Sequence, residues 1–396
     1  MAGAMKVLMD IPMREAFKTK GSEMSGRCYG PVCYLSSRKC INGGCSIRSY
    51  NLHLHQILES KKKSSLKPFK ATSMRMTQER AAGTSIISAP PKILAYELVQ
   101  GSLVRWSTFQ DKQVLETPTA VFIHGILGGR RNWASFCKRL AQEFPTWQFL
   151  LVDLRCHGDS AAISKSGPNT VVSAARDVLQ LLARLKLTPR VLVGHSFGGK
   201  VVLSMVGQAA KPLARPVQVW VLDSTPGQVR SGGDGEDHPA KIISFLRTMP
   251  AEVPSRRFVI DALLKERFSL SVAQWMTTNL RPIQNPHGGS SLGHAWLFDL
   301  NGIADLYRSY EVTNLWSLVD NVPQGIHIKF LRAERSLHRW AHEDVERIRS
   351  AEQAASSEAA GVQLHVLEAA GHWVHADNPE GLIKILTSSF SEPRLN

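Results

Sequence analysis

The chain has 396 residues, of which 43% are hydrophobic and 20% charged, a composition typical of a globular protein with a sizeable core. No apolar stretch is long enough to cross a membrane as a helix. The net charge is +15, but residues 1–80 carry +10 of it, with fifteen Lys or Arg against five Asp or Glu. Because the basic excess lies in this N-terminal fifth, outside the periodic part of the chain, nucleic-acid binding is not expected.

Residues 1–80 contain ten Ser, few acidic residues and no sustained helical or strand periodicity. A basic, Ser-rich and acid-poor N-terminus is typical of an organelle transit peptide, and the apolar core of a secretory signal is missing. We therefore expect a disordered, removable targeting segment at 1–80, with the chloroplast as destination and the mitochondrion as the alternative. The alternative interpretation of this composition is a disordered tail that carries no targeting signal.

Four of the six cysteines lie in this segment, at Cys28, Cys33, Cys40 and Cys45. Neighbouring members are separated by four, six and four residues, whereas zinc sites place paired cysteines about two to four residues apart. We expect no metal and no organic cofactor. Only Cys137 and Cys156 remain beyond this segment, too few for a disulfide framework, so a reducing compartment is expected.

From about residue 90, short apolar runs alternate with stretches of helical periodicity, which predicts βαβ units around a mostly parallel sheet. About eight strands are expected, at 93–98, 103–108, 120–124, 149–154, 191–194, 217–223, 327–331 and 362–367. Flanking helices are expected at 133–143, 171–185, 198–208, 342–356 and 381–390. The predicted fold class is α/β, with a core at 90–223 and 322–396.

The alternation breaks between 224 and 321, after the sixth expected strand and before the seventh. This region opens with the Gly-, Asp- and Pro-rich stretch 231–240 and continues with helical patterns at 242–249, 256–267 and 272–280. Open α/β sheets bind ligands beyond the carboxyl ends of their strands, where such an insertion lies. We expect a helical cap at 224–321 that forms the substrate pocket. A packing subdomain without substrate contact is the alternative.

The strongest chemical signal is Gly194-His195-Ser196-Phe197-Gly198-Gly199, which directly follows an apolar strand and directly precedes a helix. A Ser on such a tight turn has its hydroxyl exposed above the sheet, and the flanking glycines keep side chains out of the turn. Ser196 is therefore the candidate nucleophile. A Gly-rich structural turn is the alternative, which the strand–turn–helix setting disfavours.

The expected strand 120–124 is followed by a loop of His, Gly and small residues. Acyl transfer develops negative charge on a carbonyl oxygen, and backbone N–H groups must already face that oxygen. We expect the oxyanion-hole donors to be the amides of Ile126, in this loop, and of Phe197, just after the nucleophile. His124 and the loop 153–160 are interpreted as hydrogen-bonded supports of this turn.

A Ser hydroxyl needs a general base, and the candidate is His372, which follows the last expected strand and precedes the last helix. The resulting chain order of Ser, acid and His is one that recurs among hydrolases with this turn. His375 is the competitor three residues later. His372 is preferred because Gly371 lets the loop deliver it to the nucleophile.

Two residues are candidates for the acid that orients His372. In many proteins of this fold class the orienting acid follows the seventh strand, here expected at 327–331. The corresponding position in this chain is occupied by Ser336, whose side chain has no carboxyl group. The alternatives are Asp223, at the end of the sixth expected strand, and Glu334, two residues before Ser336. Asp223 is preferred, and the other role for Asp223 is that of a helix or turn cap.

These residues resemble the α/β-hydrolase superfamily, and more narrowly the small serine esterases and thioesterases that share G-H-S-x-G-G-K, here residues 194–200. Four further stretches match: H-G-x-x-G with a later N-W at 124–133, D-x-R-x-H-G-x-S at 153–160, G-H-W-x-H at 371–375, and a W-x-F-x-L-N-like stretch at 296–301. The resemblance covers about residues 93–390. In that group the acid comes from the end of strand six, which supports Asp223. The long N-terminal segment and the Ala- and Glu-rich 351–361 indicate an organelle-targeted plant member.

The residues and the resemblance together predict a serine hydrolase, of the carboxylesterase or thioesterase kind, that works through an acyl-enzyme. The expected partner is a small-molecule acyl ester or thioester, with no nucleic acid and no membrane span. Two alternatives remain open. One is a ligand-binding receptor or scaffold with little turnover, and the other is a hydrolase of non-ester bonds on the same fold.

Overall fold

The computed structural model describes residues 93–104, 117–163, 165–209, 217–229, 238–287, 289, 291–336, 340–354 and 360–391. The chain divides into two units, Met1–Gly83 and Thr84–Asn396, and every described residue belongs to the second. The expected targeting segment at 1–80 and its four cysteines therefore lie outside the described residues.

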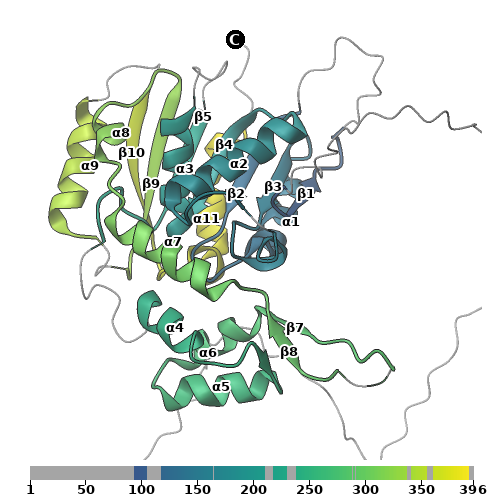
Figure 1. The fold of residues 1–396 in the computed structure, drawn as a ribbon. Coiled ribbons are helices and arrows are strands. Elements are labelled where there is room, and N and C mark those ends of the chain that lie inside the picture. The colour runs from purple at the N-terminus through teal and green to yellow at the C-terminus, as the bar shows by residue number, and fades with distance from the viewer. Residues whose placement is uncertain are drawn as a thin grey trace, which may run out of the picture. The chain divides into compact units, whose positions relative to one another are not determined.

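A seven-stranded sheet forms the centre of the described part (Figure 1). Its strands are β1 Tyr96–Gln100, β2 Thr119–Ile123, β3 Gln148–Val152, β4 Pro189–His195, β5 Val217–Leu222, β9 Ile326–Ala333 and β10 Gly361–Leu367. Their spatial order is β1-β3-β2-β4-β5-β9-β10, with β1 antiparallel to β3 and all other pairs parallel. The predicted α/β class with a mostly parallel sheet is confirmed.

The start of the sheet differs in detail from the sequence prediction. β1 begins at Tyr96 rather than at residue 93, because Tyr96 pairs with Val152, the last residue of β3. The expected strand at 103–108 lies largely outside the described residues, and its first two residues form a turn and a coil.

Both faces of the sheet are buried. Alternate residues of a strand point to opposite faces, so Val121 and Ile123 of β2 pack in the core on one side while Phe122 packs in the core on the other. All five residues of β2 and all five of β3 are buried. This explains why the strands read as continuous apolar runs rather than as alternating patterns.

Helices cover each face (Figure 1). On the Val121 side the core includes residues of α2 Val171–Leu185, α3 Phe197–Gln208, α7 Leu300–Val312, α8 Trp316–Asp320 and α9 His342–Ala354. On the Phe122 side it includes residues of α1 Ala134–Glu143, α10 Val374–Asp377 and α11 Pro379–Leu386. Short 3-10 turns lie at Arg130–Trp133, Gly158–Ser160 and Thr387–Ser389. The bounds of α2 agree with its sequence pattern, because the Thr170 side chain caps its start and Lys186 turns left-handed, with φ 54°, at its end.

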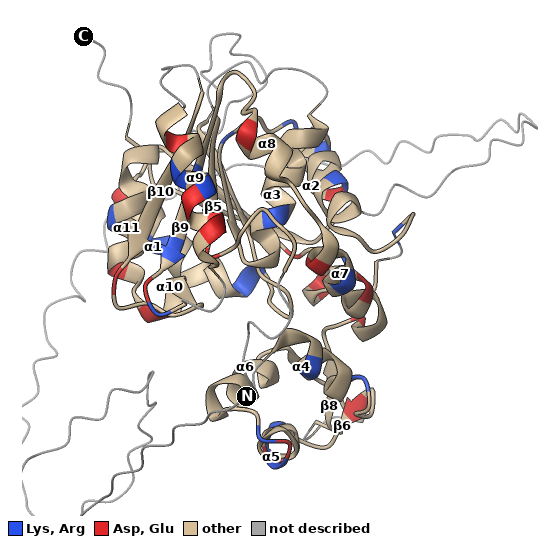
Figure 2. Cartoon of the chain, turned by 90° about the vertical axis from the view of Figure 1, so that its left-hand side faces the viewer, with Lys and Arg blue, Asp and Glu red and all other residues tan. Residues whose placement is uncertain are grey.

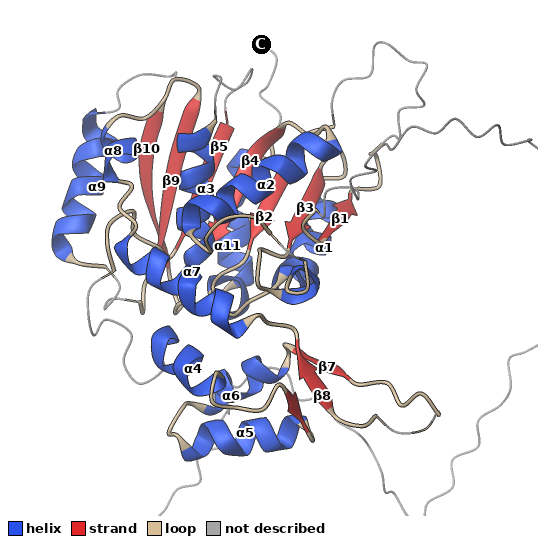
Figure 3. Ribbon diagram, viewed as in Figure 1, coloured by secondary structure: helices blue, strands red, loops and turns tan. Residues whose placement is uncertain are grey.

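An insertion between β5 and α7 contains three described helices and a small antiparallel sheet (Figure 3). The helices are α4 Pro239–Leu246, α5 Arg256–Lys265 and α6 Leu270–Thr277, close to the expected positions. The sheet has the order β6-β8-β7, with β6 Glu252–Val253, β7 Leu280–Pro282 and β8 His294–Trp296. Sequence patterns missed these strands because two or three residues carry no periodicity.

The helix α7 follows the small sheet and packs against α2 and α3. The ammonium group of Lys200, on α3, donates to the carbonyls of Tyr310 at 2.7 Å and Thr313 at 2.9 Å, at the C-terminal end of α7. The range 224–321, expected as a cap, thus includes a helix bound to the core.

The outer helices carry charges of both signs. Figure 2 shows Lys and Arg interspersed with Asp and Glu on α7 and α9. Among the residues that the structure describes, no helix is both long and apolar enough to cross a membrane.

Candidate active site

Ser196 occupies the turn between β4 and α3. Its backbone has φ 53° and ψ −117°, a strained conformation for a residue with a side chain. The Ser196 amide donates to the carbonyl of Leu222 on β5 at 2.9 Å, and the Ser196 carbonyl accepts from the amide of Gly199 at 2.8 Å. The neighbouring strand and the first turn of α3 therefore hold Ser196 in a conformation that exposes it to the cavity it lines.

The glycines around Ser196 are required by close backbone approach. A Cβ atom on Gly194 would lie 2.1 Å from the carbonyl oxygen of Gly198. A Cβ atom on Gly198 would lie 2.7 Å from the carbonyl oxygens of Ile123 and His124, at the end of β2. Since main-chain atoms cannot move aside without shifting β2, β4 and α3, the G-x-S-x-G spacing is a packing requirement of this turn.

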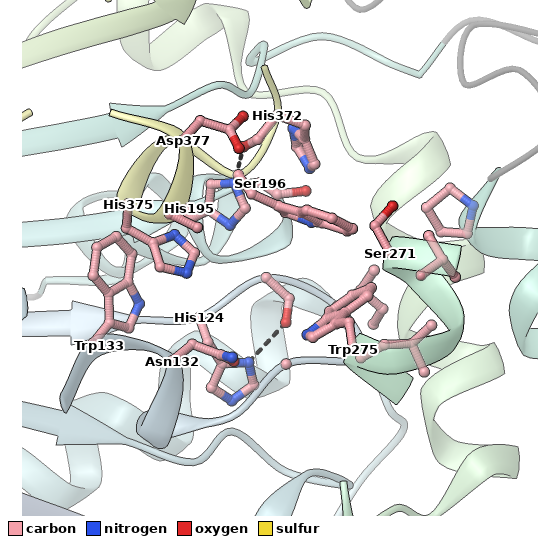
Figure 4. A pocket seen from close by; sticks show the side chains of 18 of the residues that line it. His124, Asn132, Trp133, His195, Ser196, Ser271, Trp275, His372, His375 and Asp377 are labelled. Atoms are coloured by element: carbon pink, nitrogen blue, oxygen red, sulfur yellow. Dashed lines mark hydrogen bonds between the residues drawn. The ribbon is translucent and has the colours of Figure 1, made fainter. Parts of the chain in front are cut away.

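His372 reaches the site from the loop between β10 and α10. Its Nδ1 donates to Oδ2 of Asp223 at 2.7 Å. Its ring lines the same cavity as Ser196 (Figure 4). The structure therefore brings together the nucleophile, base and preferred acid predicted from sequence, although they come from three separate loops.

Two contacts that sequence reasoning missed position the loop of His372. The Nε2 atom of His195 donates to the His372 carbonyl at 2.7 Å. The amide of Gly371 donates to a carboxylate oxygen of Asp377 at 2.7 Å. His195 and Gly371 lie inside the G-H-S and G-H-W-x-H stretches, but these patterns do not indicate which partners they bond, and Asp377 lies outside both.

Asp223 follows β5 and is 1% exposed. Its Oδ1 accepts from the Ala333 amide at 3.1 Å and from Nε1 of Trp340 at 2.8 Å. Its Oδ2 accepts from the Ser336 hydroxyl at 2.7 Å and from His372. Burial raises the pKa of this carboxyl, but the bonds from His372, Ser336 and Trp340 outweigh burial, so the pKa of Asp223 lies below its ordinary value. Asp223 is therefore an anion held by four donors, with its Oδ2 on His372.

Glu334, the alternative acid, lies elsewhere. Its Oε2 accepts from the amide of Ala369 at 2.8 Å, and the side chain is exposed. Glu334 therefore supports the turn after β10. The structure places Asp223, and not Glu334, against His372.

His375, the competing histidine, lies on α10 and packs its ring against Trp133 in a tilted arrangement, with ring centroids 4.6 Å apart. Burial and the nearby His372 together lower the pKa of His375 to about 4. No described carboxylate hydrogen-bonds His375, so it lacks the acid partner that His372 has.

The loop 125–129 lines the cavity beside Ser196. Three successive amides of this loop, from Leu127 onward, donate to acceptors within the protein at 3.1, 3.1 and 2.7 Å. The amide of Ile126 has no acceptor among the described residues. The amide of Phe197 is the first of α3, where a helix leaves its N–H groups without internal acceptors. Both amides predicted for the oxyanion hole are thus unpaired in the described structure.

Two buried histidines brace this loop. The Nε2 atom of His157 accepts from the Leu127 amide at 3.1 Å, while its Nδ1 donates to a backbone carbonyl at 2.9 Å. His124 is used in the same way, with its Nδ1 donating to the Gly125 carbonyl at 2.7 Å and its Nε2 accepting an amide at 3.1 Å. Only a neutral imidazole both donates and accepts, and burial accordingly lowers the pKa of both rings. His124 is therefore a support of the loop, as its sequence context indicates.

The loop 153–160 is tied to its surroundings by buried charges. Asp153 pairs with the guanidinium of Arg130 and accepts from the Arg130 amide at 2.7 Å. Arg155 makes two hydrogen bonds to Asp177, at 2.8 and 3.0 Å.

Burial raises the pKa of the Cys156 thiol to about 12, so Cys156 is not a reactive thiolate. Within the described part of the chain, no group of His, Cys, Asp or Glu is arranged to hold a metal ion.

The cavity above Ser196 has a volume of about 490 Å³. The insertion contributes an apolar wall that contains Ile242, Val272 and Trp275, and the rings of Trp275 and Trp373 lie 5.3 Å apart. Across Ser196, the core contributes Asn132, Trp133 and His375 (Figure 4). No described Lys or Arg lines the cavity, and Asp377 is among its described lining residues.

The chain is similar to known proteins over most of its length. The chain is 26% identical over 326 residues to the sn-1-specific diacylglycerol lipase ABHD11 of Mus musculus, which covers 80% of this chain and 92% of that protein. It is 26% identical over 277 residues to the 2-succinyl-6-hydroxy-2,4-cyclohexadiene-1-carboxylate synthase of Klebsiella pneumoniae, which covers 68% of this chain and 92% of that protein.

A solved structure and a family model complete the comparison. The solved structure of a marine microorganism esterase superposes with a TM-score of 0.57 and 19% identity, covering 75% of this chain and 98% of the esterase, and thus has the same fold. The model of the alpha/beta hydrolase family matches residues 120–385, which include the turn of Ser196 and the loop of His372. The chain therefore belongs to the alpha/beta hydrolase family.

Proposed function

We propose that this protein is a serine hydrolase that cleaves the carboxylic ester or thioester bonds of small, uncharged acyl substrates. The observation that carries the proposal is the bond from Nδ1 of His372 to the buried Asp223, in a cavity that Ser196 and His372 both line. The similarity to proteins named as lipases and esterases supports this class of reaction.

In the proposed reaction, Oγ of Ser196 attacks the substrate carbonyl carbon while Nε2 of His372 takes the hydroxyl proton. Asp223 holds the Nδ1 proton and stabilises the resulting imidazolium. The tetrahedral intermediate expels the alcohol or thiol, which receives the proton from His372, and the acyl group stays on Ser196. Water then gives a proton to His372 and attacks the acyl carbon, which releases the acid and restores Ser196.

The amides of Ile126 and Phe197 are the proposed donors to the oxyanion. Their support is that neither amide has an acceptor among the described residues, whereas the next three amides of the Ile126 loop do. One such preorganised donor is typically worth about 2.7–4 kcal/mol of the barrier. Even small shifts of this loop are therefore expected to slow the reaction.

The proposed substrate is neutral, and the insertion acts as a cap that forms the acyl side of its pocket. Ile242, Val272 and Trp275 supply apolar surface there. Because no described Lys or Arg lines the cavity, a carboxylate or phosphate on the substrate would be buried without an opposite charge. This argues against a carboxylate substrate such as the name of the Klebsiella relative implies.

The test uses Ser196→Ala beside Ser271→Ala, a second serine that lines the cavity. Hydrolysis of p-nitrophenyl butyrate and butyryl thioesters, and labelling by a fluorophosphonate probe, are expected in the wild type and in Ser271→Ala. Ser196→Ala is expected to lose labelling and at least about 10⁴-fold in kcat. Equal activity of Ser196→Ala and the wild type would refute the proposal.

The same experiment separates the enzyme from a ligand-binding protein on the same fold. A receptor with little turnover would be labelled at Ser196 but would hydrolyse no member of an ester and thioester panel. Turnover is supported by Asp223, whose buried carboxyl has a lowered pKa and is hydrogen-bonded to His372. We therefore expect turnover.

We also propose that residues 1–80 direct the protein to an organelle, with the chloroplast expected and the mitochondrion as the alternative. The support is their basic, Ser-rich and acid-poor composition. A fluorescent protein fused behind residues 1–80 is expected to accumulate in plastids of plant cells. A fusion that stays in the cytosol would refute this part of the proposal.

A further inference from the structure

The ring of His375 is a polar group that the proposed reaction does not use. It lines the cavity that also contains Ser196. Its orientation is set by two rings, that of Trp133 with centroids 4.6 Å away and that of His195 with centroids 5.6 Å away. Among the described residues, none forms a hydrogen bond with His375.

The two ring nitrogens of His375 differ in their surroundings. Nδ1 is buried and has no partner. Nε2 has no partner among the described residues and is not fully buried, and the ring to which it belongs lines the cavity. Nε2 of His375 therefore offers a bound molecule one hydrogen bond.

The position of His375 in the cavity indicates which part of a substrate it meets. In Figure 4, Trp133 and His375 lie on one side of Ser196, and Ser271 and Trp275 lie on the other. An ester whose carbonyl carbon is bonded to Ser196 extends its acyl chain and its alcohol in different directions. The apolar wall that includes Trp275 suits the acyl chain, which leaves the alcohol on the side of His375.

The charge of His375 decides the chemistry that it recognises. Burial and the nearby His372 together lower its pKa to about 4, so the ring is neutral at physiological pH. A neutral imidazole does not compensate the charge of a carboxylate or a phosphate. It does exchange a hydrogen bond with an uncharged hydroxyl.

We propose that His375 is a specificity-determining residue that hydrogen-bonds, through Nε2, a hydroxyl group on the alcohol portion of the substrate. The proposal rests on the ester hydrolysis proposed above and names a substrate feature of the same site. The preferred substrates are esters of hydroxyl-bearing alcohols with an apolar acyl group.

Two esters with the same acyl group test this proposal. Ethyl butyrate and 2-hydroxyethyl butyrate differ by one hydroxyl, and a pH-stat follows the acid released from either. The readout is the ratio of kcat/KM for the hydroxyethyl ester to that for the ethyl ester. His375→Phe keeps a ring against Trp133 and removes both nitrogens, whereas His375→Gln retains a polar atom near the position of Nε2.

In the wild type the hydroxyethyl ester is expected to be favoured. His375→Phe is expected to lower the ratio about tenfold, the worth of one ordinary hydrogen bond. His375→Gln is expected to recover most of the ratio. Thermal unfolding of both variants establishes that each is folded before its kinetics are compared.

The outcomes are distinct. A ratio that stays unchanged in a folded, active His375→Phe variant would overturn the assignment of His375 and leave the hydrolase proposal intact. A parallel loss on both esters, not recovered in His375→Gln, would also overturn it, because it would show a structural role. A wild-type protein inactive on both esters, and on the p-nitrophenyl ester, would refute the hydrolase proposal itself.

Discussion

The hydroxyl of Ser336 donates to Oδ2 of Asp223 at 2.7 Å, and this is the same oxygen that accepts from His372. Ser336 stands where sequence comparison within this fold leads one to look for an acid. Here the carboxylate that is hydrogen-bonded to His372 follows β5, and the adjacent strand β9 is followed by a residue that donates to it. The residues that follow these two neighbouring strands are therefore joined by a hydrogen bond in which the Asp223 carboxylate is the acceptor.

The first prediction concerns this carboxylate. Asp223→Asn is expected to lower kcat by about 10⁴-fold, because an amide donates to Nδ1 or leaves it unpaired and so favours the wrong tautomer of His372. Glu334→Gln is the matched control and is expected to stay within about twofold of the wild type, since Glu334 bonds the amide of Ala369. Steady-state hydrolysis of p-nitrophenyl butyrate measures both. Inactive Glu334→Gln beside active Asp223→Asn would reverse the assignment of the acid.

The second prediction concerns the turn of Ser196. Gly194→Ala is expected to lower the free energy of unfolding by about 3 kcal/mol or more, because the new Cβ would lie 2.1 Å from the carbonyl oxygen of Gly198. Gly207→Ala, on α3, has nothing within 4 Å of the new Cβ and is expected to stabilise the protein by about 0.5–1 kcal/mol. Urea unfolding compares the two. Similar midpoints for both variants would contradict the packing argument.

The third prediction concerns the brace of the oxyanion loop. His157→Phe removes the acceptor of the Leu127 amide and is expected to lower kcat by about tenfold or more with little change in KM, because the neighbouring amide of Ile126 loses its fixed direction. His327→Phe, on β9 and away from the cavity, is the control and should leave kcat unchanged. A rise in KM alone for His157→Phe would assign His157 to binding instead.

The fourth prediction concerns Lys200. Burial lowers its pKa to about 7 in the folded protein, against an ordinary value of 10.5. Between these two pH values the unfolded chain binds the proton and the folded protein releases it, so this residue makes the folded state more stable as pH rises. Below pH 7 both states are charged and the contribution is constant.

The measurement is the free energy of unfolding of the wild type minus that of Lys200→Met, followed from pH 6.5 to 10. The difference is expected to rise with pH by an amount on the order of 3 kcal/mol. Subtracting the variant removes the titration of other groups. A difference that stays flat across this range would show that Lys200 keeps its proton in the folded state.

Much of the fold followed from local sequence patterns. The continuous apolar runs predicted the positions of β2 to β5. The periodic stretch at 171–185 predicted both ends of α2 correctly. The small sheet β6-β8-β7 and the packing of α7 on α2 and α3 did not follow. Strands of two or three residues are too short to show a periodic pattern. The sequence of a helix indicates which of its faces is apolar, but not which element packs against that face.

For the candidate site, the local pattern of residues 194–199 predicted Ser196 and its glycines, because the steric limits of a tight turn act on adjacent residues. The sequence narrowed the acid to Asp223 and Glu334 and favoured Asp223. The tertiary structure places Asp223, rather than Glu334, against His372, and it adds the hydrogen bond from His195 to the carbonyl of His372, 177 positions away in the chain. Such contacts depend on how strand ends meet at one edge of the sheet and on the directions of individual side chains, and neither is encoded by the spacing of residues along the chain.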